Sequence, residues 1–503
     1  MIKKIPLQVL EVLKKIQENN FEAYIVGGCV RDLLLDKNPK DWDITTSAEP
    51  SKIIEIFPDS FYENAFGTVG VKVEKFIENG ILSEKREHDI VEVTTYRIES
   101  IYSDRRRPDE IKFASTLAED LSRRDFTVNA IALKVLNFEV GKKIASSEID
   151  VDYEVVDLFG GQDDIRKKVI KAVGDANERF GEDALRMMRA IRFHSQLDFE
   201  IEQKTFQAIK KNSKLIKHVS LERIKDELTR IVMSDKPAQG FEMMHETGLM
   251  EFIIPELEKG FGVAQNRHHI HTIYKHLILS LQYCPSNKLE VRLAALFHDI
   301  AKPQTKRGEG TYATFYNHDH VGSRLVRQIL TRLRFSNEVI EKVSMLVDNH
   351  MFYYNPDEVS EASVRRLIKK VGLENMKDLM DLRIADRLGS GTPKAKPYKL
   401  RHLEYIIEKV SKDAVSVRML KINGNDLMDD LSIAPGPKIG AILDVLLSEV
   451  IEDAEKNNKQ YLLDRARVLS NEDLSKLREM AKEKIEEKKQ EDDVEIKDRY
   501  WVK

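Results

Sequence analysis

The chain has 503 residues, of which 33% are charged and 42% hydrophobic, so its composition is that of a soluble protein with several folded domains rather than one core. With a formal net charge of −4, the overall charge gives no argument for nucleic-acid binding. The chain has only two cysteines, Cys29 and Cys284, which excludes a disulfide framework. The composition therefore predicts a cytoplasmic protein. Nucleic-acid binding by such a chain depends on local basic clusters.

The first 20 residues alternate charged and apolar side chains at helical spacing, without the apolar stretch of a secretion signal or membrane span. Short β-rich runs from Ala23 to about Asn137 predict a small mixed sheet. Helical patterns occupy most of the remainder, and the charged end KEKIEEKKQEDDVEIKD predicts a solvated helix or a frayed tail. We expect an α+β fold with four domains, which comprise residues 1–137, 138–255, 256–410 and 411–503.

A glycine turn and a pair of aspartates lie close together near the start of the chain. In YIVGGCVRDLLL an apolar strand runs into Gly27 and Gly28, and a helical pattern begins near Val30. Glycines at such a turn let backbone N–H groups approach a phosphate. Strand alternation places Asp41 and Asp43 on one face, where either a nearby Arg or Lys or a divalent cation shared with a triphosphate would neutralise them.

The glycine turn, helix and D-x-D together resemble the signature of the DNA polymerase β-like nucleotidyltransferase superfamily. The resemblance implies a five-stranded mixed-sheet head in which Asp41 and Asp43 are catalytic and hold Mg²⁺. That superfamily usually adds a third carboxylate on a later strand. In HDIVEVTTYR, Glu92 fits that place and Asp89 competes with it.

A row of arginines marks the predicted neck. In GEDALRMMRAIRF, Asp183, Arg186, Arg189 and Arg192 recur every third residue, so they follow one slowly drifting ridge of a helix. By spacing alone, an exposed face and an anion-binding face fit equally well. The segment resembles the E-D-x-x-R element of class II CCA-adding enzymes and bacterial poly(A) polymerases, in which the Asp and the Arg read the edge of the incoming base.

This resemblance covers nearly all of the first 235 residues, including DLSRRDFTVNA from Asp120, VDLFGG from Val156 and SLERI from Ser220. Without it, Arg123-Arg124-Asp125 would be interpreted as an internally paired cluster. With it, the nucleotide-binding residues are Gly28, Arg31, Arg124, Asp183, Arg186, Arg189 and Arg192.

The implied activity is addition of CCA to the 3′ end of tRNA from CTP and ATP, without a nucleic-acid template. Three segments favour this product over a poly(A) tail. NAFGTVGVKVE lacks the basic run of the polymerases, YSDRRRPDEIKF resembles the flexible loop needed for the last adenosine, and the segment from Ile422 resembles a tRNA-binding tail. An enzyme that adds only the terminal A can retain all three, so A addition and poly(A) synthesis stay open as alternatives.

The region from 261 to 410 is rich in metal-ligating residues within a helical pattern. The candidate ligands are His276, His298, Asp299, His320, His350 and Asp386. Their spacing resembles the HD metal-dependent phosphohydrolase domain, which implies a second divalent ion (Mg, Mn, Ni or Fe). A rival function follows, namely hydrolysis at RNA 3′ ends carrying a 2′,3′-cyclic phosphate or a 3′-phosphate, and a scaffold role is the other alternative. The sequence leaves the oligomeric state open.

Overall fold

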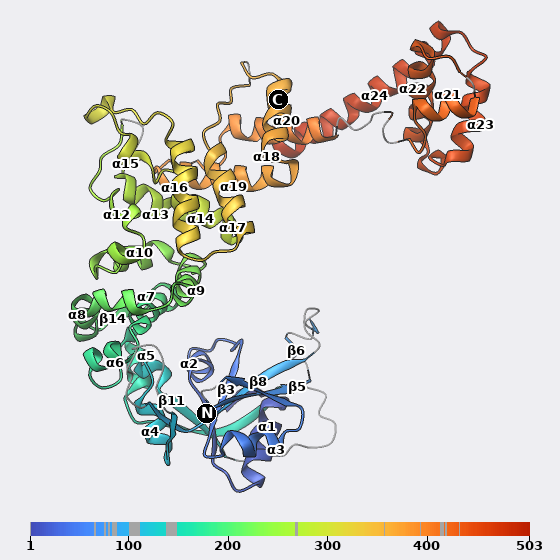
Figure 1. The fold of residues 1–503 in the computed structure, drawn as a ribbon. Helices are drawn as coiled ribbons and strands as arrows, with labels where there is room; N and C mark the ends of the chain where they lie inside the picture. The colour runs from blue at the N-terminus through green and yellow to red at the C-terminus, as the bar shows by residue number, and fades with distance from the viewer. Residues whose placement is uncertain are drawn as a thin grey trace.

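The computed structural model is an elongated molecule with a sheet-containing head at one end, a column of helices above it, and a helical unit that extends sideways (Figure 1). Within the part of the chain that it describes, no helix combines the length and apolar character that a membrane crossing requires. The residues described are 2–64, 67–74, 77–78, 81–82, 88–99, 111–136, 148–266, 270–356, 358–392, 394–412, 417, 420–431 and 433–502.

The head is built on a mixed sheet, as expected, but eight of the described strands form it rather than five. Only β3 and β8 run parallel, and the other neighbouring pairs are antiparallel. In sheet order the strands are β1 (Ile2–Pro6), β12 (Glu148–Asp157), β11 (Ile131–Val135), β2 (Ala23–Val26), β3 (Trp42–Thr46), β8 (Asp89–Thr95), β5 (Thr68–Val73) and β4 (Ser60–Asn64).

Two of the extra strands correct the expected organisation. The helix α1 (Leu7–Glu18) begins only after Pro6, because residues 2–6 form β1 instead. The strand β12 pairs with both β1 and β11, so the sheet continues past the boundary expected at residue 137. Helix α1 buries Val9, Leu13 and Ile16 in the hydrophobic core beside the sheet, as its apolar spacing predicts.

The neck consists of helices that pack around a central one. Helix α7 contacts both α9 and α10, and α6 contacts α8. Ser220 lies at the predicted N-cap of α9, although its side chain makes no capping hydrogen bond. The bounds are α6 (Ala176–Glu182), α7 (Leu185–Leu197), α8 (Gln203–Asn212), α9 (Leu221–Val232) and α10 (Pro237–Glu246).

In the next helical region, helices pack closely around a polar centre. Helices α13 and α19 approach so closely at Gly389 that a Cβ there would lie 2.1 Å from Ser280 Oγ, so only glycine fits. Helix α16 packs along α17, and α14 lies against both α13 and α17. The bounds are α13 (Ile273–Gln282), α14 (Leu289–Phe297), α16 (His318–Arg332), α17 (Asn337–Asn349) and α19 (Leu373–Gly389).

The last part of the chain leaves this column and returns to it. Helix α20 (Tyr398–Lys412) leads to α21 (Gly424–Leu431), α22 (Pro437–Glu452) and α23 (Lys459–Leu469), which bury a hydrophobic cluster of their own. Helix α24 (Leu474–Tyr500) then runs back to α20 (Figure 1), where Arg401 Nη1 donates to the Trp501 carbonyl at 3.1 Å. The charged end is therefore a helix with an anchored terminus rather than a frayed tail.

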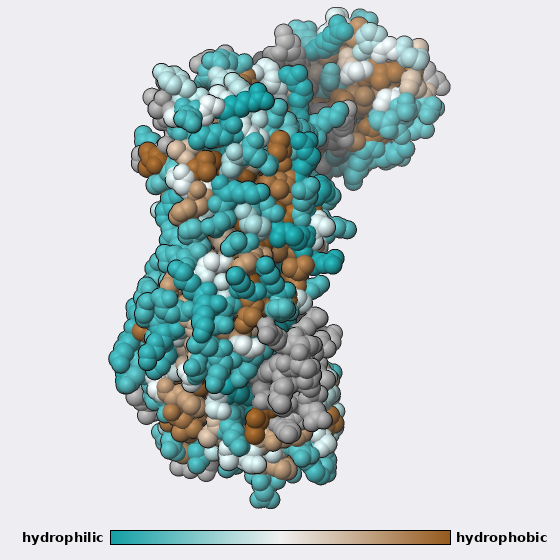
Figure 2. Space-filling model, turned by 60° about the vertical axis from the view of Figure 1, so that its left-hand side comes forward, coloured by the Kyte–Doolittle hydropathy of each residue, from teal (hydrophilic) through white to brown (hydrophobic). Residues whose placement is uncertain are grey.

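Hydrophilic side chains cover most of the face shown in Figure 2, and hydrophobic ones gather in patches along the helical column and on the C-terminal unit. This distribution agrees with the high charged fraction of the sequence. Residues 100–110, which include most of the segment expected to act as a flexible loop, lie outside the described residues.

A candidate nucleotidyl-transfer site and a candidate metal centre

In the candidate site of the head, the glycine turn lies against both Arg124 and Asp43. Gly27 adopts φ 88° and ψ −137° at the N-terminal end of α2 (Gly28–Leu34), a conformation that is nearly restricted to glycine. A Cβ at Gly27 would lie 3.1 Å from Arg124 Nη1 and 3.4 Å from Asp43 Oδ2. The turn, a guanidinium and a carboxylate therefore meet at one point.

We expect Gly27→Ala to lower both the melting temperature and the rate of nucleotide incorporation. The strained backbone costs about 1–3 kcal/mol, and the new methyl group presses on Arg124 and Asp43. Differential scanning fluorimetry and an incorporation assay measure the two effects. Gly440→Ala is the matched control, because a Cβ at Gly440 in α22 meets nothing within 4 Å. An unchanged Gly27→Ala protein would show that the turn tolerates a side chain.

The strand register distinguishes the two candidates for the third carboxylate. Asp43 of β3 is the direct partner of Glu92 in the parallel neighbour β8, so the two side chains emerge on the same face. Asp89 is three residues earlier in β8 and pairs with Val73, which directs it to the opposite face. Asp41 is exposed, one residue before β3. Asp43 and Glu92 therefore offer carboxylate oxygens, the ligands that Mg²⁺ prefers, on one face of the sheet.

We expect Glu92→Gln to reduce nucleotide incorporation by about 100-fold or more, because it removes one negative oxygen ligand while keeping the side chain's shape. Asp89→Asn, on the same strand but the opposite face, should leave the rate within about twofold of the unmodified chain. Single-turnover incorporation of labelled CMP measures both. Equal loss in the two variants, or loss in Asp89→Asn alone, would overturn the assignment to Glu92.

Buried aspartates hold the arginines beside this turn. Asp120 of α4 (Leu117–Ser122) accepts hydrogen bonds from Thr45 Oγ1 at 3.2 Å, Arg123 Nη2 at 2.7 Å and Arg124 Nη2 at 3.2 Å. Burial raises the pKa of Asp120, but the positive charges of Arg124 and Arg123 lower it by a larger amount, so this pKa lies below its usual value. Asp120 therefore stays ionised and positions Arg124 against the glycine turn, a role that the sequence analysis did not assign.

The arginine ridge is real, but Asp183 lies outside its helix. Helix α7 begins at Leu185, whose N–H donates to Asp183 Oδ1 at 3.0 Å. Arg223 of α9 also binds Asp183: its Nη2 donates to Asp183 Oδ2 at 2.6 Å. Arg186 Nη1 donates to Glu182 Oε2 at 2.7 Å, and its Nη2 donates to the Arg123 carbonyl at 3.0 Å. Arg223 is a further candidate residue that sequence reasoning missed.

The remaining arginines of the predicted set differ in accessibility. Arg189 is 32% exposed, and its Nε donates to Asp125 Oδ2 at 2.6 Å. Burial raises the pKa of Asp125, but the charge and hydrogen bond of Arg189 outweigh burial and lower this pKa to about 2. Arg192 is buried, and its Nη1 donates to Glu227 at 3.0 Å. Arg31 is also buried, with Nη1 donating to Asn129 at 2.8 Å.

The guanidinium groups of Arg31 and Arg192 lie 5.2 Å and 4.3 Å from the ring centroid of Phe193. The Arg31 contact ties α2 to α7, and the hydrogen bond from Arg192 to Glu227 ties α7 to α9.

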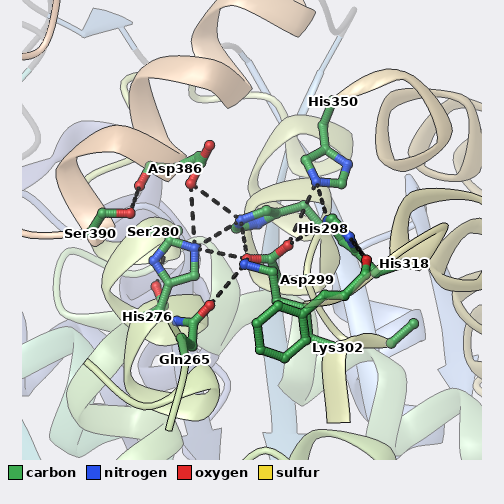
Figure 3. Close-up of polar contacts among 12 residues, drawn as sticks. Gln265, His276, Ser280, His298, Asp299, Lys302, His318, His350, Asp386 and Ser390 are labelled. Atoms are coloured by element: carbon green, nitrogen blue, oxygen red, sulfur yellow. Dashed lines mark hydrogen bonds and ion pairs between the residues drawn. The ribbon is translucent and has the colours of Figure 1, made fainter. Parts of the chain in front are cut away.

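A second polar cluster lies inside the helical region (Figure 3). Buried imidazole nitrogens from four histidines converge on two aspartates, with distances from Nε2 to carboxylate oxygen between 3.1 and 3.6 Å. Lys302 Nζ completes the cluster, 2.6 Å from Asp299 Oδ2 and 2.8 Å from Gln265 Oε1. Its six potential metal ligands are His276, His298, Asp299, His318, His350 and Asp386.

The structure corrects one of the ligands expected from the sequence. His318, not His320, is in the cluster, because residues two apart on α16 point about 200° away from each other. The side chain of His320 is 51% exposed, and its Nδ1 lies 2.7 Å from Asp348 Oδ1. The other five expected residues come together as predicted.

Three of the histidines are held in one orientation. Nδ1 of His298, His318 and His350 lies 3.0, 2.7 and 2.7 Å from the backbone carbonyl oxygen three residues earlier. A carbonyl oxygen only accepts, so Nδ1 must carry the hydrogen and Nε2 must face the cluster. This arrangement fixes the tautomer in metal-binding histidines. The donor set therefore fits one or more divalent ions.

Comparison with known proteins places the chain among RNA-modifying enzymes. Residues 23–171 match the family described as poly A polymerase head domain, residues 198–261 a probable RNA and SrmB-binding site of polymerase A, and residues 306–466 a putative tRNA nucleotidyltransferase domain 2. The crystal structure of the Bacillus stearothermophilus CCA-adding enzyme in complex with CTP is 26% identical, with a TM-score of 0.56, over 92% of this chain and 98% of that one.

The similarity in sequence extends over almost the whole chain. The CCA-adding enzyme of Lactococcus lactis subsp. cremoris is 33% identical over 468 residues, which cover 92% of this chain and 97% of that enzyme. The chain belongs to the CCA-adding enzyme family. The CCA-adding enzyme of Lactobacillus helveticus is 42% identical over 253 residues, 50% of this chain and 56% of that enzyme.

As a member of this family, the chain is a nucleotidyltransferase, and the α+β class expected from its sequence is confirmed. The roles of individual residues, the domain boundaries other than the one expected at residue 137, and the HD assignment of residues 256–410 remain predictions.

Proposed function

We propose that this chain builds or repairs the 3′ CCA end of tRNA in the cytoplasm, using CTP and ATP and no nucleic-acid template. The observation that carries the proposal is the pairing of Asp43 with Glu92 across two parallel strands, beside a glycine turn flanked by Arg124. In a chain that belongs to the CCA-adding enzyme family, this is the arrangement that nucleotidyl transfer needs.

In the proposed reaction the 3′-hydroxyl oxygen of tRNA bonds to the α-phosphorus of CTP or ATP. The bond from that phosphorus to the bridging oxygen breaks, pyrophosphate leaves, and the proton of the hydroxyl is released to solvent. Asp41, Asp43 and Glu92 would hold Mg²⁺, which neutralises the charge of the triphosphate when bound. The N–H groups at the start of α2 and the guanidinium of Arg124 contribute further donors on the other side of the turn.

Base selection is assigned to Asp183 and Arg186. A carboxylate accepts a hydrogen bond from the exocyclic amine that cytosine and adenine share, and a guanidinium donates to their acceptor atoms. Hydrogen bonds from Arg223 to Asp183 and from Arg186 to Glu182 hold both side chains in place before a nucleotide binds. Such rigidity is what reading a base without a template requires.

The deciding experiment supplies labelled CTP or ATP with Mg²⁺ to tRNA lacking CCA, to tRNA ending in CC, and to an unrelated RNA. Addition of C, C and A that stops there, and only on tRNA, would support the proposal. ATP incorporation restricted to the CC-ended tRNA would identify an A-adding enzyme, and long A tails on any RNA a poly(A) polymerase. No incorporation would favour the rival phosphohydrolase activity of the helical region.

A further inference from the structure

Helix α9 connects the candidate base-reading residues to the helical region that follows the neck. It contacts α7 of the neck and α14 of the helical region, and Figure 1 shows it at the junction between the two. Its first turn carries Arg223, which binds Asp183, and it ends at Val232. We propose that Arg292 of α14 is a positioning residue for base selection that acts through α9 on Asp183, an inference that rests on the proposed function of the chain.

The side chain of Arg292 is directed at the C-terminal end of α9. Its Nε donates to the Val232 carbonyl at 2.8 Å, and its Nη2 donates to the Ser234 carbonyl at 3.1 Å. The last carbonyls of a helix have no partner within the helix and carry partial negative charge, so a guanidinium suits them well. Arg292 is 8% exposed, so water cannot readily take its place. The end of α9 is therefore fixed to α14.

Glu227 holds α9 against α7 near the middle of the helix. This buried carboxylate accepts a hydrogen bond from Arg192 Nη1 at 3.0 Å. At about 1.5 Å per residue, Arg223 lies ~6 Å before Glu227 along the helix axis and Val232 lies ~7.5 Å after it. A rigid helix that pivots at Glu227 therefore moves Arg223 about as far as it moves Val232. Since Arg223 Nη2 and Asp183 Oδ2 are 2.6 Å apart, a shift of about 1 Å stretches their hydrogen bond beyond its usual range.

A second contact across the same junction provides the matched control. Gln282 of α13 donates from Nε2 to the Asp235 carbonyl at 2.9 Å, and its Oε1 accepts from the Ala238 N–H at 3.4 Å. Both partners lie beyond the end of α9, in the connection to α10 and at the start of α10. Gln282 therefore holds the junction without holding the end of α9, and its loss should leave base selection unchanged.

The first test compares incorporation of UTP and CTP on tRNA lacking CCA, well below the melting temperature of each full-length variant. Arg292→Met keeps an apolar stem but removes every donor, and it should raise incorporation of UTP relative to CTP by about 2- to 30-fold. Arg292→Lys should restore part of the selectivity, because an ammonium can bind one of the two carbonyls. Gln282→Ala should match the unmodified chain. Unchanged selectivity in Arg292→Met, or an equal change in Gln282→Ala, would overturn the proposal.

A double-mutant cycle tests the route through α9. If Arg292 acts through Arg223, the effects of Arg292→Met and Arg223→Ala on selectivity do not add, and the double variant selects no worse than Arg223→Ala alone. Additive effects would show that Arg292 acts independently of Arg223 and would overturn this route.

Hydrogen exchange of α9 separates a failure of this inference from a failure of the proposed function. Amides of residues 221–232 should exchange faster in Arg292→Met than in the unmodified chain, and Gln282→Ala should leave them unchanged. An unmodified chain that adds no nucleotide to tRNA would contradict the proposed function. Unchanged exchange in Arg292→Met would instead refute the coupling of α14 to α9, whatever the activity.

Discussion

Replacing Asp43 with Asn is expected to reduce nucleotide incorporation by about 1000-fold or more, equivalent to ~4 kcal/mol of lost transition-state stabilisation. The substitution keeps the shape of the side chain but removes the negative charge beside the glycine turn, at the position whose register partner in β8 is Glu92. Binding of tRNA should change little, because Asp43 belongs to the reacting centre. Single-turnover incorporation of CMP and fluorescence anisotropy with labelled tRNA measure the two quantities.

Asp59→Asn is the matched control, since this carboxylate is 74% exposed and its recorded partner is Lys72 on the surface. It should retain the incorporation rate and the melting temperature of the unmodified chain. A large drop in melting temperature for Asp43→Asn, with tRNA binding lost in parallel, would support the alternative that the aspartate pair is structural.

Features encoded within a few neighbouring residues were predictable from the sequence. The strand, glycine turn and helix around Gly27 follow from an apolar run and two glycines, and the structure has each in its expected place. Likewise Asp43 falls in a strand, and Arg186, Arg189 and Arg192 fall in one helix. These features depend on local backbone preferences, which the sequence states directly.

Features set by contacts between distant segments were not predictable. The choice of Glu92 over Asp89 depends on the register between β3 and β8, which are separated by four other strands in the chain order. The salt bridge from Arg223 to Asp183 joins side chains 40 residues apart. No pattern within either segment indicates its partner.

The exchange of His320 for His318 has a different origin. Both lie in the stretch His318-Asp319-His320, and only the rotation of α16 decides which side chain faces Asp299. That rotation is set by packing of α16 on α17 and not by the ligand residues themselves. A helix start shifted by one or two residues is within the usual error of sequence reasoning, but it changes the assigned ligand.

Replacing Arg186 with Ala is expected to relax the choice of base more than it weakens binding of the triphosphate. A bidentate contact between a guanidinium and a base edge is worth about 1–3 kcal/mol, so incorporation of UTP or GTP relative to CTP should rise by roughly 5- to 150-fold. The KM for CTP should rise less, because Arg124 and Arg189 remain. Competition between labelled nucleotides on tRNA lacking CCA measures the selectivity directly.

The contacts of Arg186 also allow a purely structural role, and the same variant separates the two. Its guanidinium joins Glu182 to the Arg123 carbonyl, so removing it will also lower the melting temperature. Arg166→Ala provides the control, since that side chain is 73% exposed and pairs with Asp163 on the surface. A destabilised Arg186→Ala protein with unchanged selectivity would assign Arg186 to holding the neck against the head, and base reading would then rest on Asp183.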